Sequence, residues 1–324
     1  MARKLEYSED TNLRQKQRKD VVRIVLLGKT GKGKSATGNT ILNGDFFKST
    51  RSFMSITSEC SLKEAMRFGK HIQVVDTPGI FDNNFPSDEV KNEIIRCVFM
   101  SSPGPHCFLL VLGLDRFTPE ENESVNEFCN LFGNNVFRYF IIVFTRKDEL
   151  DHDGKTLEQH LSTAHTDLRL ILQKCNNRCI AFNNREKGLA REEQVKTLLN
   201  MIDELRKENG EEYYTNEFYL EAEDFLKQKE KEIEEKRERE RMEEARAIEL
   251  EVQTMYPDVN EQSMEKERRL RQLALKNSFL LSPRLQILRE LATNDETITK
   301  LFVAGIGAVT ALAIHHFMKR GLQI

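Results

Sequence analysis

Short apolar runs and stretches of helical character alternate along residues 21–208. The apolar runs lie at 21–27, 72–75, 107–112, 139–144 and 179–182, and the helical stretches lie near 34–43, 88–101, 119–132, 156–173 and 191–208. Runs without polar alternation are typical of strands buried on both faces, and intervening helices supply the crossovers between parallel strands. The pattern therefore predicts an α/β domain with a doubly wound, mostly parallel sheet over residues 21–215. Ligands of such a domain bind at the carboxyl ends of the strands.

The regions that flank this domain differ from it in composition. Residues 1–20 are polar, mixed in sign and without periodicity, and we expect a flexible arm. Residues 216–296 are rich in charge, with pairs such as Glu232 and Lys236 that support an exposed helix at i,i+4 spacing. We interpret them as a charged helical, coiled-coil-like extension. A solvated helix fits better than a true coiled coil, which needs a denser apolar seam. Pro283 interrupts any continuous helix there.

The segment 301–318 contains no Asp, Glu, Lys or Arg, and basic residues flank it at Lys300 and at Lys319-Arg320. A helix of this length extends roughly 27 Å, which is marginal but sufficient for a bilayer core of about 30 Å. We expect a C-terminal hydrophobic helix that anchors the chain after translation. The rest of the protein would then lie on the cytoplasmic face of the mitochondrial outer membrane or the endoplasmic reticulum. The alternatives are a helix buried against the domain or a partner, and peripheral attachment, since His315 and His316 weaken the span.

Charge and cysteine usage exclude several classes of protein. The net charge of −3 gives no basic footprint for a nucleic-acid partner. The six cysteines are scattered without a CxxC pair, and no secretory signal is recognisable at the start. A disulfide scaffold and a structural zinc site are therefore not expected, and we interpret the chain as a reduced, intracellular protein.

A phosphate-binding loop directly follows the first apolar run. Gly28, Lys29, Thr30, Gly31, Lys32, Gly33, Lys34 and Ser35 form a complete GxxxxGK[ST] motif, and Ala36 leads into the helix that follows. Backbone N–H groups of such a loop surround a phosphate, and the helix N-terminus adds its dipole. We expect Lys34 to reach the β- and γ-phosphates and Ser35 to ligate Mg²⁺.

Asp76-Thr77-Pro78-Gly79 closes the second long apolar run. An aspartate at a strand end opposite the phosphate loop suits a Mg²⁺ ion held through water, and the Gly79 amide could contact a γ-phosphate. Alone, this tetrapeptide would be read as a Pro-Gly turn that ends a strand. The phosphate loop about 40 residues earlier makes the nucleotide interpretation the stronger one.

A third motif distinguishes guanine from adenine nucleotides. Thr145-Arg146-Lys147-Asp148-Glu149 follows the apolar run 139–144, at the place of an [N/T]KxD-type motif. A carboxylate there accepts hydrogen bonds from guanine N1 and N2, which adenine cannot supply, and the Lys147 stem can lie along the base. Either Asp148 or Glu149 could be that carboxylate, and without the other motifs a charged turn would explain the segment.

Five segments together resemble the GIMAP family, the GTPases of immunity-associated proteins, over residues 21–215. They are GKTGKGKSATGNTIL, DTPG, LLVLGLDRFTPEE, FTRKDEL and AFNNR, in that order. The resemblance implies a Ras-like P-loop GTPase domain related to septin and chloroplast-import GTPases. It further implies that Thr57 is the switch threonine and a Mg²⁺ ligand, that Ser49 lies near the nucleotide, and that Asn183 or Asn184 lies against guanine. Family members often carry TRKED where this chain has TRKDEL, so the base contact stays open.

The sequence therefore predicts a GTP- and GDP-binding protein that uses Mg²⁺ and hydrolyses GTP slowly. Ras-like enzymes orient the attacking water with a glutamine after DTPG, and this chain has Ile80. Arg116 is the candidate for supplying catalysis in trans within a homo-oligomer that forms through the nucleotide face, although it could instead pair with Glu120 or Glu121. By resemblance, the nucleotide state would control self-assembly, with a role in lymphocyte survival. The alternatives are a GTP-dependent scaffold with negligible hydrolysis and an ATP-using P-loop enzyme.

Overall fold

The computed structural model describes residues 21–49, 59–79, 87–210, 212–278 and 280–293. The described residues form two compact units that divide between Ala222 and Glu223. The predicted arm at 1–20 and the predicted anchor at 301–318 lie outside the described residues. Within the described part, no helix combines the length and the apolar character needed to cross a membrane.

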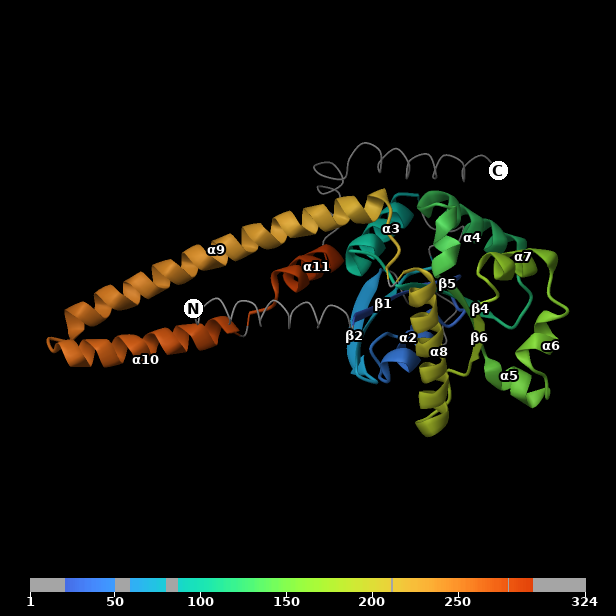
Figure 1. The fold of residues 1–324 in the computed structure, drawn as a ribbon, viewed down its shortest axis with the longest axis horizontal. Helices are drawn as coiled ribbons and strands as arrows, with labels where there is room; N and C mark the ends of the chain where they lie inside the picture. Colours follow the sequence, from blue (N-terminus) through green and yellow to red (C-terminus); the bar gives the residue numbers. More distant parts are fainter. Residues whose placement is uncertain (1–20, 50–58, 80–86, 211, 279, 294–324) are drawn as a thin grey trace. The chain divides into compact units, whose positions relative to one another are not determined.

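The first unit is built on a six-stranded sheet (Figure 1). Its strands are β1 (Val21–Leu27), β2 (Ser61–Arg67), β3 (Lys70–Asp76), β4 (Cys107–Gly113), β5 (Phe140–Thr145) and β6 (Cys179–Phe182). They lie in the order β2-β3-β1-β4-β5-β6, and every neighbouring pair is parallel except β2 and β3. The predicted doubly wound, mostly parallel sheet is confirmed. The chain leaves β1 on one side toward β3 and later returns on its other side as β4, which opens a ligand crevice at the carboxyl end of β1.

The helices of the first unit largely follow the predicted stretches. They are α2 (Lys34–Leu42), α3 (Ser87–Ser101), α4 (Pro119–Phe132), α5 (Lys147–His152), α6 (Leu157–Leu161), α7 (Thr166–Lys174) and α8 (Gly188–Glu208), with a 3-10 turn at Asn134–Tyr139. The prediction of a single helix near 156–173 is wrong, because one helix ends with α6 and a second one begins with α7. His165 caps the second start by accepting a hydrogen bond from the Asp167 N–H. Neither β2 nor α5 was predicted.

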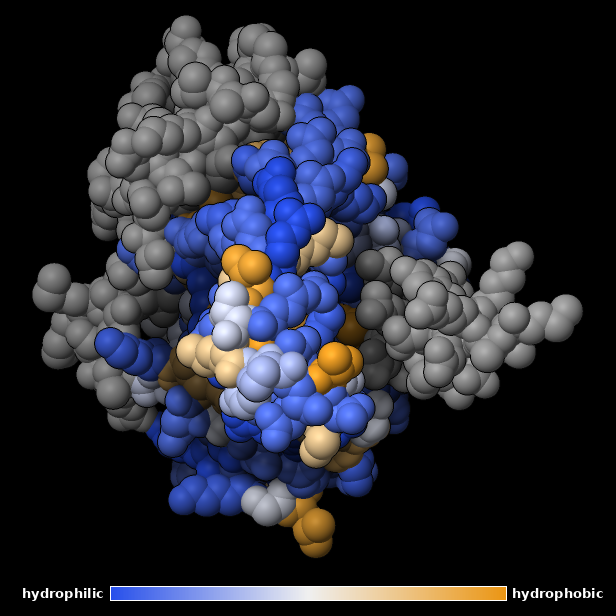
Figure 2. All heavy atoms as spheres, turned by 90° about the vertical axis from the view of Figure 1, so that its left-hand side faces the viewer, coloured by the Kyte–Doolittle hydropathy of each residue, from blue (hydrophilic) through white to orange (hydrophobic). Residues whose placement is uncertain are grey.

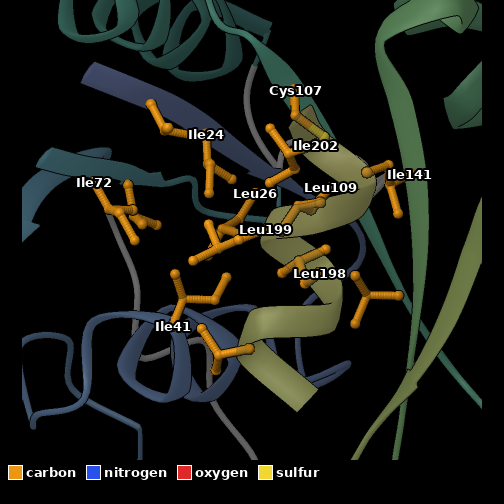
Figure 3. Close-up of a cluster of buried hydrophobic side chains, with 14 of the residues drawn as sticks. Ile24, Leu26, Ile41, Ile72, Cys107, Leu109, Ile141, Leu198, Leu199 and Ile202 are labelled. Atoms are coloured by element: carbon orange, nitrogen blue, oxygen red, sulfur yellow. The ribbon is translucent and has the colours of Figure 1, made fainter. Parts of the chain in front are cut away.

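The core forms where α2 and α8 cover one face of the sheet (Figure 3). The side chains of α8 that face the sheet recur at helical spacing, and all are nearly inaccessible to solvent: Val195, Leu198, Leu199, Ile202 and Leu205. They pack with strand residues such as Ile24, Leu109 and Ile141. Phe108 and Phe140 precede those strand residues and therefore face the opposite side. There their rings contact Phe128, which α4 contributes.

The second unit consists of long, charge-rich helices. These are most of α9 (Glu217–Met255), which begins in the first unit, α10 (Val259–Ser278) and α11 (Pro283–Thr293). Ion pairs from Lys266 to Glu249, at 2.5 Å, and from Arg269 to Glu251, at 2.9 Å, place α9 and α10 side by side. The view onto the tip of this unit is mainly hydrophilic, with separate hydrophobic spots (Figure 2). The predicted charged helix is present. Pro283 is the first residue of α11, a position where the missing N–H of proline costs no helical hydrogen bond.

Candidate functional site

The predicted motifs gather at one edge of the sheet. Five strands, β1 and β3 to β6, run parallel, so their carboxyl ends meet there. The segments that leave these ends carry the phosphate loop, Thr77-Pro78-Gly79, the β4–α4 loop with Arg116, the start of α5, and Asn183-Asn184. The topology therefore assembles one site from residues that lie far apart in sequence.

The phosphate loop has the strand–loop–helix context that its motif requires, since it connects β1 to α2. Lys34 begins α2 and is only 6% exposed. Its Nζ donates hydrogen bonds to the carbonyl oxygens of Gly28, at 2.8 Å, and Lys29, at 3.1 Å. Gly28 has φ +139°, and a Cβ there would lie 2.4 Å from the Val111 carbonyl oxygen. Only glycine fits this position, and the lysine ammonium is held directly over the loop.

Two oxygen-bearing side chains meet beside the phosphate loop. Ser35 Oγ donates a hydrogen bond of 2.5 Å to Asp76 Oδ2. Thr77 Oγ1 donates to the Leu26 carbonyl at 2.7 Å, which keeps the end of β3 against β1. Hydroxyl and carboxylate oxygens are the ligands that Mg²⁺ prefers, so this pair fits the predicted cation. Thr57, the third predicted ligand, lies outside the described residues. Among the residues described, no group of three or more His, Cys, Asp or Glu side chains could hold a metal ion.

Thr145 connects the base-reading motif to the phosphate loop. Its Oγ1 donates to the Lys32 carbonyl oxygen at 2.9 Å and lies 3.2 Å from that of Leu112. Arg146 then turns the chain with φ 67° and precedes α5. Thr145 therefore points inward, toward the phosphate loop, and the residues after it lead into α5.

The two candidate carboxylates of this motif have different surroundings. Asp148 Oδ2 accepts a 2.8 Å hydrogen bond from Arg185 Nη1, and this pair links the start of α5 to the segment after β6. Glu149 is 58% exposed and lies 3.9 Å from Arg146. Lys147 pairs with Asp151 one turn along α5, at 2.7 Å. Asp148 is thus the carboxylate directed toward the neighbouring strand end.

Asn184 joins β6 to α2 by two hydrogen bonds. Its Oδ1 accepts from Thr40 Oγ1 at 2.9 Å, and its Nδ2 donates to Thr37 Oγ1 at 3.0 Å. Asn183 Nδ2 donates to Glu186 Oε1 at 3.0 Å. Both predicted amides therefore have protein partners at the rim of the site. The motif alone gave no signal of the partners of Asn184, because these threonines lie on α2.

Ser49 lies beside α2. Its Oγ is 3.3 Å from Asn39 Nδ2, and the same amide donates to the Phe47 carbonyl at 2.8 Å. The Asn39 side chain therefore holds the segment that leads toward Thr57. Ile80 and Thr57 themselves lie outside the described residues.

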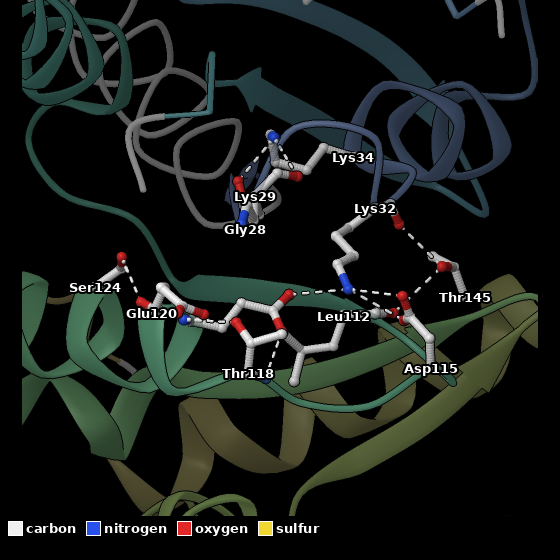
Figure 4. A network of polar contacts seen from close by, with 11 residues as sticks. Gly28, Lys29, Lys32, Lys34, Leu112, Asp115, Thr118, Glu120, Ser124 and Thr145 are labelled. Atoms are coloured by element: carbon white, nitrogen blue, oxygen red, sulfur yellow. Dashed lines mark hydrogen bonds and ion pairs between the residues drawn. The ribbon is translucent and has the colours of Figure 1, made fainter. Parts of the chain in front are cut away.

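Lys32 contacts the loop between β4 and α4 (Figure 4). Its Nζ lies 3.0 Å from both oxygens of Asp115 and 3.0 Å from Glu121 Oε1. Glu121 also forms a capping box with Thr118, in which each residue bonds the other's backbone N–H. The Thr118-Pro119-Glu120-Glu121 sequence carries the capping-box signature, which agrees with the helix predicted to start near residue 119.

Arg116 lies between these two contacts and is exposed. Within the described residues it forms no ion pair with Glu120 or Glu121, so the alternative considered for it is not observed. Glu121 is engaged by Lys32 instead. A hydrogen bond with Thr118 lowers the pKa of Glu120, and its own backbone and the positive charge of Lys29 lower it further.

Comparison with known proteins places these motifs in a wider group. The sequence model of the AIG1 family matches residues 22–235. Immune-associated nucleotide-binding protein 9 of Arabidopsis thaliana is 38% identical over 204 residues, which cover 62% of this chain and 60% of that protein. GTPase IMAP family member 8 of Mus musculus is 38% identical over 198 residues, 60% of this chain and 28% of that protein. Among solved structures, Toc33 from Arabidopsis thaliana in complex with Mg²⁺ and GMPPNP matches with a TM-score of 0.44 and 17% identity, over 61% of this chain and 89% of that chain.

Proposed function

The chain belongs to the AIG1 family, and on this premise we propose that it binds GTP and GDP with Mg²⁺ and hydrolyses GTP slowly. The family membership confirms the resemblance that the five motifs predicted. One observation carries the proposal. The phosphate loop, the Ser35–Asp76 pair and the Thr145–Asp148 segment all lie at one edge of one sheet, connected by hydrogen bonds.

Each part of this edge has a task toward a nucleoside triphosphate. The backbone N–H groups from Lys29 to Ser35 and the helix start bind phosphate oxygens, and Lys34 exchanges its loop carbonyls for the β- and γ-phosphates. Ser35 and Asp76 would hold Mg²⁺, which supplies charge neutralisation at those phosphates. Gly79 follows three residues after Asp76, and its backbone N–H would contact the γ-phosphate.

Guanine recognition is assigned to Asp148. Because Thr145 points toward the phosphate loop, the carboxylate three residues later is the one directed to the segment after β6. Guanine offers two N–H donors to a carboxylate, while adenine leaves it unsatisfied, which costs more than a neutral hydrogen bond. Arg185 holds Asp148 in this structure, and we propose that Arg146, Lys147, Asn183 and Asn184 lie around the base when it binds.

A competition assay with the full chain tests the proposal. Mg²⁺-GTP and GDP should bind at least about tenfold more tightly than ATP, a difference of roughly 1.4 kcal/mol. Lys34→Ala should abolish binding of both guanine nucleotides, whereas Lys63→Ala, at an exposed position on the edge strand β2, should leave binding intact. Equal affinity for ATP would overturn guanine specificity, and normal binding by Lys34→Ala would remove the phosphate-loop assignment.

Hydrolysis is proposed to depend on self-assembly. With isoleucine at position 80, one copy lacks the glutamine that orients water, and the exposed Arg116 could reach the γ-phosphate of a second copy. An arginine supplied in trans is worth about 10³–10⁵ in rate in related enzymes. Hydrolysis per protein should rise with protein concentration, and Arg116→Ala should flatten the rise. A flat, negligible rate in single-turnover assays of the wild type would favour the alternative, a GTP-dependent scaffold.

Membrane attachment through residues 301–318 is the remaining part of the proposal. The absence of charge in this segment and its basic flanks support an anchor that leaves the GTPase unit on the cytoplasmic face of an intracellular membrane. Alkaline carbonate extraction tests it, since release of the full chain into the soluble fraction would reject the anchor. A role in immune cells rests on the names of the relatives and is proposed on that basis alone.

A further inference from the structure

The loop that carries Arg116 is held on both sides of the arginine. On one side, Asp115 binds Lys32 Nζ through both carboxylate oxygens, each at 3.0 Å. On the other side, Thr118 and Glu121 close the capping box of α4, and Glu121 Oε1 also lies 3.0 Å from Lys32 Nζ. Lys32 is 13% exposed and Glu121 is 4% exposed, so this contact is largely shielded from water.

Gly113 provides independent support for this arrangement. A Cβ on Gly113 would lie 2.1 Å from Asp115 Oδ1 and 3.6 Å from Lys32 Cδ. The Asp115 side chain therefore folds back across the glycine to reach Lys32, in space that any other residue would fill. The lack of a side chain at Gly113 thus leaves room for the contact between Asp115 and Lys32.

Charge makes this contact important for Arg116. Asp115 is its neighbour in sequence, and Glu121 stands at the start of the helix that the loop enters. Both carboxylates are close enough along the chain to attract the Arg116 guanidinium, but both already have the Lys32 ammonium group as a partner. Arg116 accordingly forms no ion pair within the described part of the chain and is exposed.

We propose that Lys32 is a positioning residue for Arg116. By binding Asp115 and Glu121, Lys32 keeps these carboxylates from capturing the guanidinium within the same chain and leaves it for the nucleotide of a second copy. This inference rests on the proposed action of Arg116 in trans. Lys32 thereby has two separate tasks, because its backbone belongs to the phosphate loop while its side chain controls a loop that acts on another molecule.

The test compares the wild-type full chain with Lys32→Ala and then compares Lys32→Ala with two variants that also lack Lys32, so that in the second comparison any effect on the phosphate loop itself cancels. Lys32→Ala alone should reduce the concentration-dependent rise in hydrolysis about fivefold, as expected for an exposed ion pair that competes with the active arrangement. Adding Asp115→Asn and Glu121→Gln removes the competing carboxylates and should restore the rise. Gln at position 121 preserves the capping box. In the matched control, Glu123→Gln and Glu127→Gln remove two charges elsewhere on α4 and should restore nothing.

A second measurement does not depend on hydrolysis. Phenylglyoxal modifies accessible arginines, and mass spectrometry of the nucleotide-free chain can follow Arg116. Labelling should be fast in the wild type, slower in Lys32→Ala, and fast again in the triple variant.

The outcomes separate this inference from the proposed function. Equal labelling of Arg116 in the wild type and in Lys32→Ala would overturn the positioning role of Lys32. Failure of the triple variant to recover, in labelling or in hydrolysis, would overturn it as well. If hydrolysis by Arg116→Ala kept its full dependence on protein concentration, the proposal that Arg116 acts in trans would be rejected. Labelling would still show whether Lys32 keeps Asp115 and Glu121 from binding Arg116.

Discussion

Single side chains with two partners connect the parts of the candidate site. Thr145 binds the Lys32 carbonyl from the end of β5, and Asn184 binds two threonines of α2 from the end of β6. The motif residues were predictable from sequence because each motif is local. Their side-chain partners were not: Lys32 and Asp115 are 83 residues apart, and only the tertiary fold brings them together.

Asp148→Asn should lower the affinity for GTP about tenfold or more, because an amide cannot accept both guanine N–H groups as a carboxylate does. Affinity for ATP should change little, so that the preference between the two nucleotides disappears. Glu149→Gln is the matched control and should retain the preference. Isothermal titration with each nucleotide measures both effects. Loss of preference in the control and not in Asp148→Asn would reverse the assignment.

Gly28→Ala should destabilise the phosphate loop more than an ordinary glycine substitution does. The new Cβ would meet the Val111 carbonyl, a backbone atom that cannot move aside, and φ there is positive. We expect a loss of nucleotide binding together with a lower free energy of unfolding, by about 1–3 kcal/mol. Urea denaturation followed by circular dichroism measures the second effect. Unchanged stability and binding would show that the loop can adopt another path.

The helices and strands differed in how well they could be predicted from the sequence. The four-residue strand β6 was predicted with its observed bounds because its apolar run is isolated. β2 was missed because it is an edge strand, SLKEAMR, whose side chains are half-buried or exposed and show no apolar run. The short helix α5 was missed since KDELDH is charged, and its start is set by the turn at Arg146.

The entry to β4 contains a buried histidine that gives the fold a pH dependence. The Arg23 N–H donates to His106 Nδ1 at 3.0 Å, so that nitrogen must be unprotonated. Burial, together with the charges of Arg23 and Arg206, lowers the pKa of His106 from 6.5 to about 2. The unfolded chain therefore binds a proton below pH 6.5 that the folded chain does not bind, and stability falls as the pH drops through that range.

His106→Asn should weaken this pH dependence, because Asn accepts the same hydrogen bond and does not titrate. Between pH 7 and pH 5 the histidine alone should remove about 2 kcal/mol from the free energy of unfolding. Urea denaturation of both proteins at the two pH values gives the difference. If the variant lost as much stability as the wild type on acidification, other groups would account for the effect.

The whole molecule combines a densely packed unit with a solvated one. Of the described residues, none between Lys227 and Leu250 is buried, whereas β4 is buried along its whole length. Few tertiary contacts protect such a helix from local opening. The charge content of residues 216–296 indicated a charged helical extension, but α10 and α11 were not predicted individually, because residues 256–296 show mixed periodicity.

Hydrogen–deuterium exchange should reflect the two units. Peptides from residues 230–250 should exchange much faster than peptides from β4 or β5, because the α9 backbone opens locally while the strands exchange only on unfolding of the sheet. Mass spectrometry of the full chain without nucleotide provides the comparison. Equal protection in both units would indicate that a partner surface or a second copy covers α9.

The convergence of five strand ends has a thermodynamic consequence. A site that draws on residues from Gly28 to Asn184 exists only while the whole sheet is assembled, so a nucleotide that binds there cannot bind the disordered chain. Binding then shifts the folding equilibrium by mass action, by about 2.7 kcal/mol at a hundredfold excess over the dissociation constant. The guanine nucleotide supply of a cell would thus set how much of this chain escapes degradation, independently of any signal that the bound nucleotide conveys.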